Sequence, residues 1–171
     1  IIANRYQTKH HKLSIDAART LPALRECIGQ MSEPMVSHDN VGFYLLSQEV
    51  AKFVKVVQSG QGADEIFAGY HWYPPLMDSR DPLNDYVGHF FDRSHAEYAA
   101  AVDTHFVERD YSINFVRRHF AAPGAEAPID KALRIDTTVM LVDDPVKRVD
   151  NMTMAWGLEA RVPFLDHEVV E

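Results

Sequence analysis

Two glycines and two carboxylates follow a short apolar run and could bind an anion together with its metal ion. Residues 54–57 favour a strand, Gly60 and Gly62 follow it, and Asp64 and Glu65 open an apolar segment with helical spacing. Glycine allows positive φ and close approach of a ligand to the amides at a helix start. Two carboxylates repel a bare phosphate, whereas Mg²⁺ combines one or two carboxylates with phosphate oxygens. We therefore predict a site for a nucleotide bound with Mg²⁺, the alternative being an ordinary turn with Asp64 as helix N-cap.

A basic pair, Lys147 and Arg148, forms the second stretch that could do chemistry. The preceding Asp144-Pro145 predicts an N-cap and a first-turn proline, and Gly157 predicts the helix end. Cations at a helix start oppose the helix dipole, so we expect this pair to face an acid or a phosphate. The alternative is a solvated surface pair between Lys147 and Asp150.

The elements that position these residues read as an α/β arrangement. We expect a strand at 11–15, a helix at 17–30 capped by Asp16, a helix at 40–52 capped by Ser37 or Asp39, and the strand at 54–57, an order typical of a parallel sheet. Apolar residues cover most of the circumference of the helix at 40–52, which predicts burial on more than one side. The chain from 71 to 82 reads as a loop and residues 121–128 as a linker. Helical spacing recurs at about 83–91, 98–106, 111–120 and 129–141. We expect a βαβ nucleotide-binding part at 1–75 and a helical part at 76–171.

Composition limits the function classes. The chain has 171 residues, 46% of them hydrophobic, and a net charge of −8, which disfavours non-specific nucleic-acid or anionic-membrane binding. The single Cys27, the lack of an apolar run of ~20 residues and the lack of a signal-peptide pattern favour the cytoplasm. The nine histidines lack the spacing of zinc ligands. The chain begins without Met and stops in what reads as a new helix, so we expect a fragment of a longer protein.

Two long motifs together resemble a known family. Ser-Gly-x-Gly-x-Asp-Glu-x-Phe-x-Gly-Tyr at 59–70 and Val-Asp-x-Met-x-Met-Ala-x-Gly-Leu-Glu-x-Arg-Val-Pro-Phe-Leu-Asp at 149–166 resemble the synthetase domain of the glutamine-dependent asparagine synthetase family, over essentially the whole chain. Glu33-Pro34 and residues 44–47 fit the same family in order and spacing. Gln61, residues 71–75 and residues 144–148 look most like its N-acetylglutaminylglutamine amidotransferase subgroup.

The resemblance implies a two-step reaction with ATP and Mg²⁺ as cofactors. ATP adenylates a small-molecule carboxylate and releases pyrophosphate, and ammonia from the glutaminase domain of the same parent chain then forms an amide. By resemblance, Ser59 and Gly60 touch the adenylate and Asp64 binds magnesium, while Gly62 belongs to the same cofactor turn. Arg148, with Lys147 beside it, aligns with the catalytic lysine that stabilises charge on the phosphate.

Three departures from the family pattern qualify this expectation. The family's pyrophosphate loop and its glutaminase with a Cys nucleophile are absent from these residues. Gln61 replaces an Asp or Glu, and a carboxamide cannot act as general base. Ser37-His38-Asp39 replaces Asp-Ser-Ser near the amino-acid substrate, which favours an acceptor other than aspartate, such as a glutamine-containing dipeptide.

The implied fold is an adenine-nucleotide alpha-hydrolase-like α/β domain that lacks its first strands. In its sheet order 3-2-1-4-5, residues 11–15 are strand 3 and residues 54–57 are strand 4. We therefore expect a predominantly helical chain with strand content below ~20–25%, homo-oligomers formed through residues 11–58, and no activity in the isolated fragment. The alternative is a non-catalytic nucleotide-binding or helical interaction module that docks through the helices between 83 and 120, which would not release pyrophosphate.

Overall fold

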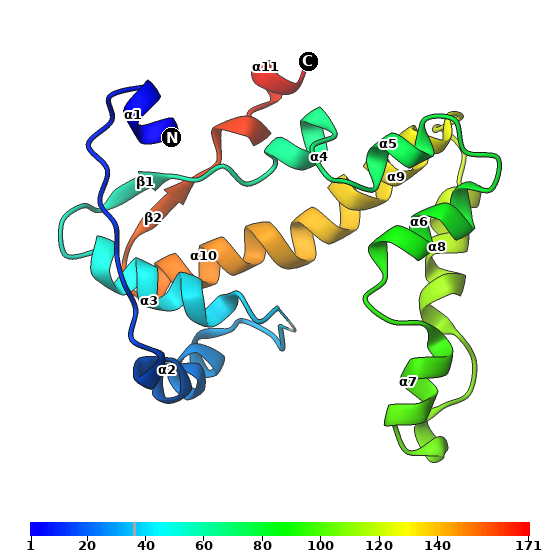
Figure 1. Ribbon diagram of the computed structural model, residues 1–171, viewed down its shortest axis with the longest axis horizontal. Helices are drawn as coiled ribbons and strands as arrows, with labels where there is room; N and C mark the ends of the chain where they lie inside the picture. The colour runs from blue at the N-terminus through cyan, green and yellow to red at the C-terminus, as the bar shows by residue number, and fades with distance from the viewer. Residues whose placement is uncertain (36) are drawn as a thin grey trace. The chain divides into compact units, whose positions relative to one another are not determined.

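A computed structural model describes residues 1–35 and 37–171, and it divides the chain into two compact units. Unit 1 comprises Ile1–Ser59 and Lys147–Arg161, and unit 2 comprises Gly60–Val146 and Val162–Glu171. Figure 1 shows the helices and strands of each unit. Among the described residues, no helix is both long enough and apolar enough to cross a membrane.

Unit 1 contains a short parallel strand pair. Strand β1 (Val56–Gln58) pairs with β2 (Glu159–Arg161), with Val57 opposite Ala160. Backbone bonds extend the ladder at both ends, from the Glu159 amide to the Lys55 carbonyl at 2.9 Å and from the Ser59 amide to the Arg161 carbonyl at 2.8 Å. The strand predicted at 54–57 is thus confirmed with a small shift, while β2 was not predicted.

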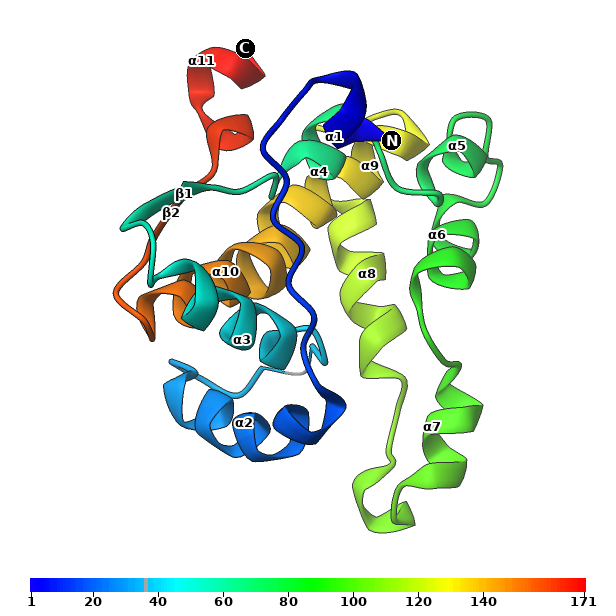
Figure 2. The same ribbon diagram turned by 60° about the vertical axis from the view of Figure 1, so that its left-hand side comes forward.

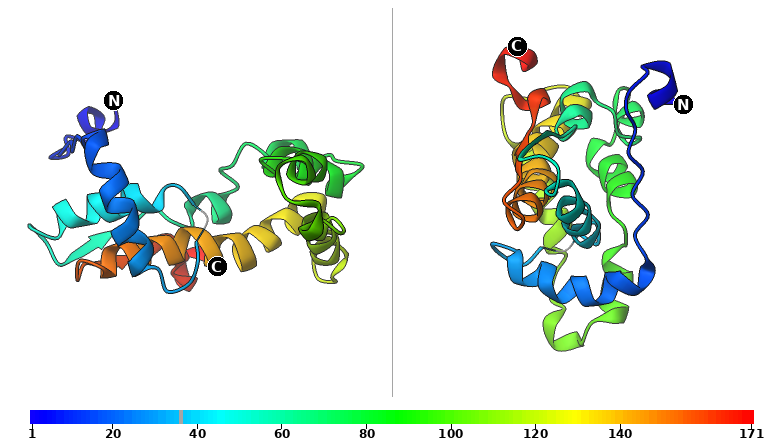
Figure 3. Two further views of the ribbon diagram at one scale, coloured as in Figure 1. Left: turned by 90° about the horizontal axis from the view of Figure 1, so that it is seen from below. Right: turned by 90° about the vertical axis from the view of Figure 1, so that its left-hand side faces the viewer.

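Four helices are found among the described residues of unit 1. They are α1 (Ile2–Arg5), α2 (Ala17–Gln30), α3 (Asn40–Val50) and α10 (Lys147–Met154). Helices α3 and α10 lie along the same face of the strand pair (Figure 1), and α2 crosses α3 (Figure 3). Their core consists of Ala23, Cys27, Tyr44, Leu45 and Met152.

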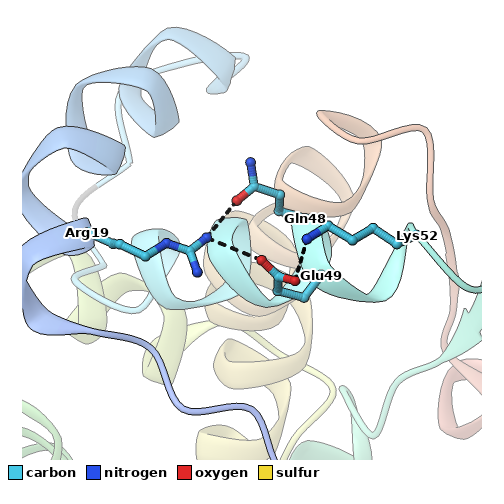
Figure 4. Close-up of polar contacts among 4 residues, drawn as sticks. All are labelled: Arg19, Gln48, Glu49 and Lys52. Atoms are coloured by element: carbon cyan, nitrogen blue, oxygen red, sulfur yellow. Dashed lines mark hydrogen bonds and ion pairs between the residues drawn. The ribbon is translucent and has the colours of Figure 1, made fainter.

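Helix α2 begins where the sequence predicts. The Asp16 carboxylate accepts a hydrogen bond of 2.9 Å from the Ala18 amide, which satisfies one of the donors that a helix start leaves open. Two polar contacts then tie α2 to α3, because Arg19 Nη2 donates to Gln48 Oε1 at 2.9 Å and to Glu49 Oε1 at 3.3 Å (Figure 4). A hydrogen bond from Lys52 to Glu49 is the main cause of the lowered pKa of Glu49.

One expectation for unit 1 is wrong and another is confirmed. Residues 11–15 form no strand, since a strand needs the backbone groups of a neighbour and the described residues offer none there. Burial of helix α3 on more than one side is confirmed, since it packs against both α2 and α10 and buries Tyr44, Leu45 and Ser47, while Leu46 is 43% exposed. The apolar residues around α3 therefore do not all face protein.

Unit 2 is helical, as predicted. Its α-helices are α4 (Ala63–Phe67), α5 (Tyr73–Leu76), α6 (Pro82–Phe90), α7 (His95–Ala101), α8 (Tyr111–Ala121), α9 (Pro128–Ile135) and α11 (His167–Val170). Two 3₁₀ segments, η1 (Thr104–Phe106) and η4 (Pro163–Leu165), and two π-helical segments, η2 (Asp136–Met140) and η3 (Val142–Val146), complete it. Helices α6 and α8 lie side by side (Figure 2), and the core there consists of Tyr73, Leu76, Tyr86, Val116, Phe120, Ala132 and Ile135. Helix α5 interrupts the stretch predicted as a loop.

The helix start predicted at Asp144 is wrong. The chain keeps helical geometry from α9 through α10, and Pro145 lies inside the π-helical η3. Proline lacks an N–H and collides with the preceding turn of an α-helix, and the wider π-helical turn accommodates it. Lys147 and Arg148 therefore do not oppose the dipole of a helix start. The predicted stop is confirmed, since α10 ends at Met154 and Gly157 follows with φ +62°.

Candidate functional site

Gly62 fixes the turn that follows β1. It has φ +91°, and a Cβ at this position would overlap the side chain of Leu165. A larger residue is thus excluded both by backbone conformation and by space. Gly60 shows neither constraint, because it lacks a positive φ and a Cβ there would meet no atom within 4 Å. The predicted need for glycine is confirmed at Gly62 only.

Asp64 stands exposed in the first turn of α4 and its position depends on Gly69. The Gly69 amide donates to the Asp64 carbonyl at 2.8 Å, and Ala68 between them adopts a left-handed φ of +53°. A Cβ on Gly69 would lie 3.0 Å from Asp64 Cγ and overlap its carboxylate. Gly69 therefore leaves the space in which the Asp64 carboxylate sits.

Glu65 does not share this exposure. It is 2% exposed, and its Oε1 accepts a hydrogen bond of 2.7 Å from Tyr70 Oη. Burial, followed by this bond to Glu65, raises the pKa of Tyr70 well above its ordinary range, so the hydroxyl remains a donor. The interpretation of Asp64 and Glu65 as two carboxylates facing one cation is corrected, because only Asp64 faces solvent.

The other turn residues are distributed over both units. Ser59 is the last residue of the first segment of unit 1, whereas Gly60 and Gln61 belong to unit 2. The Ser59 amide is bonded to the Arg161 carbonyl, so its hydroxyl is the group it can offer to a ligand. Ser59 and Gln61 are half-buried.

In unit 1, the basic pair contacts the segment that precedes α3. Lys147 Nζ forms an ion pair with Glu33, and Arg148 Nη1 donates to Ser37 Oγ at 2.7 Å. Asn151, one turn further along α10, accepts at Oδ1 a hydrogen bond of 2.6 Å from the Ser32 amide. The alternative partner suggested for Lys147, Asp150, is thus replaced by Glu33. Glu33-Pro34 was recognised as a motif, but nothing in its spacing revealed this contact.

Arg148 is the more enclosed of the two cations. Its side chain is 10% exposed against 21% for Lys147. The guanidinium carbon lies 5.3 Å from the centroid of the Phe43 ring, and Nη1 lies 3.8 Å from Asp39 Oδ2. The ring and the neighbouring polar groups thus hold a charged group that would otherwise lose solvation on burial.

A buried carboxylate in unit 2 was missed by sequence reasoning. Asp136 is fully buried and accepts from Trp72 Nε1 at 2.9 Å, from Tyr73 Oη at 2.7 Å and from Tyr86 Oη. Burial raises the pKa of Asp136 above its ordinary value, although the three hydrogen bonds oppose the shift. The sequence signal was weak, since residues 129–141 contain two acids, Asp130 and Asp136, and their spacing did not show which of them is buried. It carried no indication of the aromatic partners of Asp136, which lie 50–64 residues away in sequence.

Asp64 is the exposed carboxylate that this turn could offer to a metal ion. The described part of the chain contains no cluster of three or more His, Cys, Asp or Glu side chains able to hold a metal ion. A single exposed carboxylate such as Asp64 suits Mg²⁺, which keeps several waters or phosphate oxygens in its shell. Asp64 thus offers one oxygen ligand of the kind that Mg²⁺ takes.

A small parallel strand pair and a majority of helices define the chain as a mostly helical α/β protein. Comparison with known proteins defines it further. The profile of the asparagine synthase family matches residues 1–171. The chain belongs to this family.

Individual relatives agree with this assignment. The chain is 29% identical to a Mycobacterium bovis protein provisionally named a glutamine-hydrolysing asparagine synthetase, over 94% of this chain and 30% of that protein. It is 27% identical to asparagine synthetase 3 of Bacillus subtilis, over 97% of this chain and 28% of the relative. It is 24% identical to asparagine synthetase B of Escherichia coli, over 99% of this chain and 23% of that protein. The chain thus spans about a quarter of the length of these relatives.

Proposed function

We propose that the protein carrying this chain uses ATP to adenylate a substrate carboxylate and converts it to an amide with ammonia from glutamine. Membership of the asparagine synthase family supports this, and the relatives are named as glutamine-hydrolysing synthetases. The observation that carries the proposal is the exposed Asp64 on a turn whose shape depends on Gly62 and Gly69. The glutamine would be hydrolysed by a glutaminase domain of the same protein.

In this proposal Asp64 binds the Mg²⁺ that accompanies ATP. Magnesium bound there supplies charge neutralisation on the phosphates, which displacement at phosphorus needs more than covalent help. Ser59 would contact the nucleotide through its hydroxyl, Gly60, beside which space is open, would let the phosphate approach the backbone, and Gly62 would hold the shape of the cofactor turn.

Arg148 would stabilise negative charge on the phosphate, with Lys147 as the second cation. A guanidinium offers a permanent charge and paired donors for phosphate oxygens. Arg148 Nη1 is engaged with Ser37, so phosphate binding requires an exchange of that hydrogen bond. Gln61 would orient ammonia or the acceptor by hydrogen bonding, since it cannot take up a proton.

Pyrophosphate release in the protein that carries this chain tests the proposal. Asp64→Asn is expected to abolish ATP-dependent and acceptor-dependent release because the amide loses the charge that binds magnesium. Asp78→Asn provides the matched control, since Asp78 is also an exposed acid of unit 2. Release near the wild-type rate by Asp64→Asn at saturating magnesium removes Asp64 from the mechanism.

For the acceptor, we propose the terminal carboxylate of a glutamine-containing dipeptide rather than aspartate. The reasons are Gln61 and the segment Ser37-His38-Asp39, in which the His38 side chain is 97% exposed. The two acceptors are to be compared at equal concentration by the amide formed. Faster formation of asparagine than of the dipeptide amide contradicts this choice, while leaving the adenylation proposal intact.

We further propose that copies of the chain associate through residues 11–58. Three large apolar side chains of α2 remain exposed, namely Leu21 at 76%, Leu24 at 39% and Ile28 at 57%. Apolar surface of this kind favours association with another chain. Sedimentation equilibrium at micromolar concentration is expected to show a dimer or larger species that Leu21→Glu dissociates. A monomer at all concentrations contradicts the proposal.

A further inference from the structure

Three exposed arginines line an open surface cavity of about 260 Å³ in unit 2. Its lining consists of Arg109, Tyr111, Asn114, Arg117 and Arg118. No acidic side chain belongs to this lining, although the chain as a whole carries a net charge of −8. The cavity therefore concentrates positive charge in an acidic protein.

Helix α8 places four of these residues on one side. Tyr111, Asn114 and Arg118 follow each other at i, i+3 and i+7 and so share a face, and Arg117 flanks them. Arg109 precedes the helix, and its guanidinium carbon lies 4.8 Å from the centroid of the Tyr111 ring. Helical spacing and one cation–π contact thus bring the three arginines to the lining of the same cavity.

Local contacts restrict the arginine side chains. Arg117 Nη1 donates to Asn114 Oδ1, and Asn114 Nδ2 in turn donates to the Asp110 carbonyl at 2.6 Å. The Arg118 guanidinium carbon lies 5.8 Å from the Phe115 ring centroid. These contacts use few of the five N–H donors on each guanidinium, so most remain for a ligand.

No protein carboxylate of the described residues forms a direct ion pair with these arginines. Within the described residues, no carboxylate oxygen lies within 4.0 Å of a guanidinium nitrogen of Arg109, Arg117 or Arg118. The two nearest acids in sequence have other partners, since Glu108 accepts from Tyr111 Oη at 2.7 Å and Asp110 accepts from the Ile113 amide at 2.9 Å. A bound anion would relieve the repulsion among the three arginines.

We infer that this cavity binds a chain of at least two phosphates, either as free pyrophosphate or as the phosphate tail of a nucleotide. Guanidinium groups bind phosphate oxygens through paired, charge-assisted hydrogen bonds. Three of them suit an anion with several charged groups, and the volume suits a compact ligand better than a whole cofactor. None of these residues belongs to the site assigned above, so the inference is independent of the proposed function.

Binding of inorganic pyrophosphate, measured by isothermal titration in EDTA without an acceptor, tests the inference. Arg117→Gln and Arg118→Gln are each expected to weaken binding roughly tenfold, because each removes a hydrogen-bonded charge. The double substitution should weaken it further, and increasing salt should weaken wild-type binding. Arg80→Gln is the matched control, since it removes one exposed charge elsewhere in unit 2 and should change affinity less than twofold.

Parallel titrations with metal-free ATP distinguish the two sources of the phosphate chain. If the double variant loses affinity for ATP and for pyrophosphate equally, the site accepts the phosphate chain from either source. If it loses affinity for pyrophosphate alone, the site binds the free anion. Circular dichroism verifies that the variants are folded. Undetectable binding to the wild type, or equal affinity of the wild type and the double variant, overturns the inference. Because no reaction is measured, this result does not depend on pyrophosphate release or Asp64.

Discussion

Asp136→Asn is expected to destabilise unit 2 through a single hydrogen-bond conflict. The carboxylate receives two donors at Oδ2, from Trp72 and Tyr73, and one at Oδ1, from Tyr86. An amide can place its oxygen toward the first two, but its NH₂ group then donates to Tyr86 Oη, and the Tyr86 O–H loses its acceptor in a residue that is 1% exposed. A buried donor without a partner costs about 1–3 kcal/mol, and neutral acceptors bind more weakly than charged ones. Removal of the buried charge offsets part of these costs, so we expect the free energy of unfolding to fall by about 2–4 kcal/mol at neutral pH.

Urea unfolding followed by Trp72 fluorescence measures this loss, in a Trp156→Phe background that leaves one tryptophan. Tyr86→Phe supplies the second side of a double-mutant cycle. Tyr86→Phe alone should lower the free energy of unfolding by about 1–2 kcal/mol. In the Asp136→Asn background it should lower it by close to zero, because the carboxylate that accepts from Tyr86 is already lost. Additive costs, or a cost of Asp136→Asn below about 0.5 kcal/mol, would refute a network in which Asp136 holds these aromatic donors.

The pH dependence of the same variant has a defined sign. Burial raises the pKa of Asp136 in the folded state, so the folded state binds more protons than the unfolded state once the pH passes the ordinary aspartate value of about 3.9. The contribution of Asp136 to stability therefore falls as the pH rises from that value through the raised pKa of the folded state. Asp136→Asn should lack this fall, so the stability difference between wild type and variant should narrow as the pH rises through that window.

Two further substitutions test local structure. Gly62→Ala should destabilise the turn by roughly 1–3 kcal/mol, because Gly62 has a φ of +91° and an added Cβ would overlap Leu165. Gly88→Ala in α6 is the control, since an added Cβ there meets open space, and it should be neutral or stabilising by about 0.5–1 kcal/mol. Equal effects of the two substitutions in urea unfolding contradict the role given to Gly62. Ser94→Ala should cost about 1 kcal/mol by removing the capping box that Ser94 forms with Glu97 at the start of α7, and hydrogen exchange of the α7 amides should increase; unchanged exchange counts against the cap.

Regular spacing of apolar residues and short capping signals predicted much of the fold. The Asp16 cap and the apolar residues of α2 gave that helix its observed bounds, and the same spacing located α6 and α8 within a few residues. The predominance of helix over two three-residue strands is confirmed.

Features that depend on distant partners could not be predicted. Strand β2 contains Glu159 and Arg161, whose charge does not suggest a strand, and it forms because Val56–Gln58 lies beside it. Residues 11–15 alternate in hydrophobicity but have no neighbour with which to pair. Pro145 resembled a helix start because the π-helical geometry that accommodates it leaves no sequence signal.

In the candidate site, the features that depend on local residue types were predictable and those that depend on packing were not. The glycine turn and Asp64 follow from local residue types, and the structure gives Gly62 the expected positive φ. The burial of Glu65 and the contact of Arg148 with Ser37 depend on packing, which a local pattern does not specify. The roles of these residues in catalysis stay predictions.

The central claim is that the acceptor carboxylate attacks the α-phosphorus of ATP, releases pyrophosphate and leaves one of its oxygens on AMP when ammonia forms the amide. The most direct measurement uses an acceptor labelled with ¹⁸O in its carboxylate, in the protein that carries this chain, with mass analysis of the phosphorylated products. The account predicts one ¹⁸O atom in each AMP formed and none in inorganic phosphate. Label in inorganic phosphate, with ADP as the nucleotide product, would contradict it.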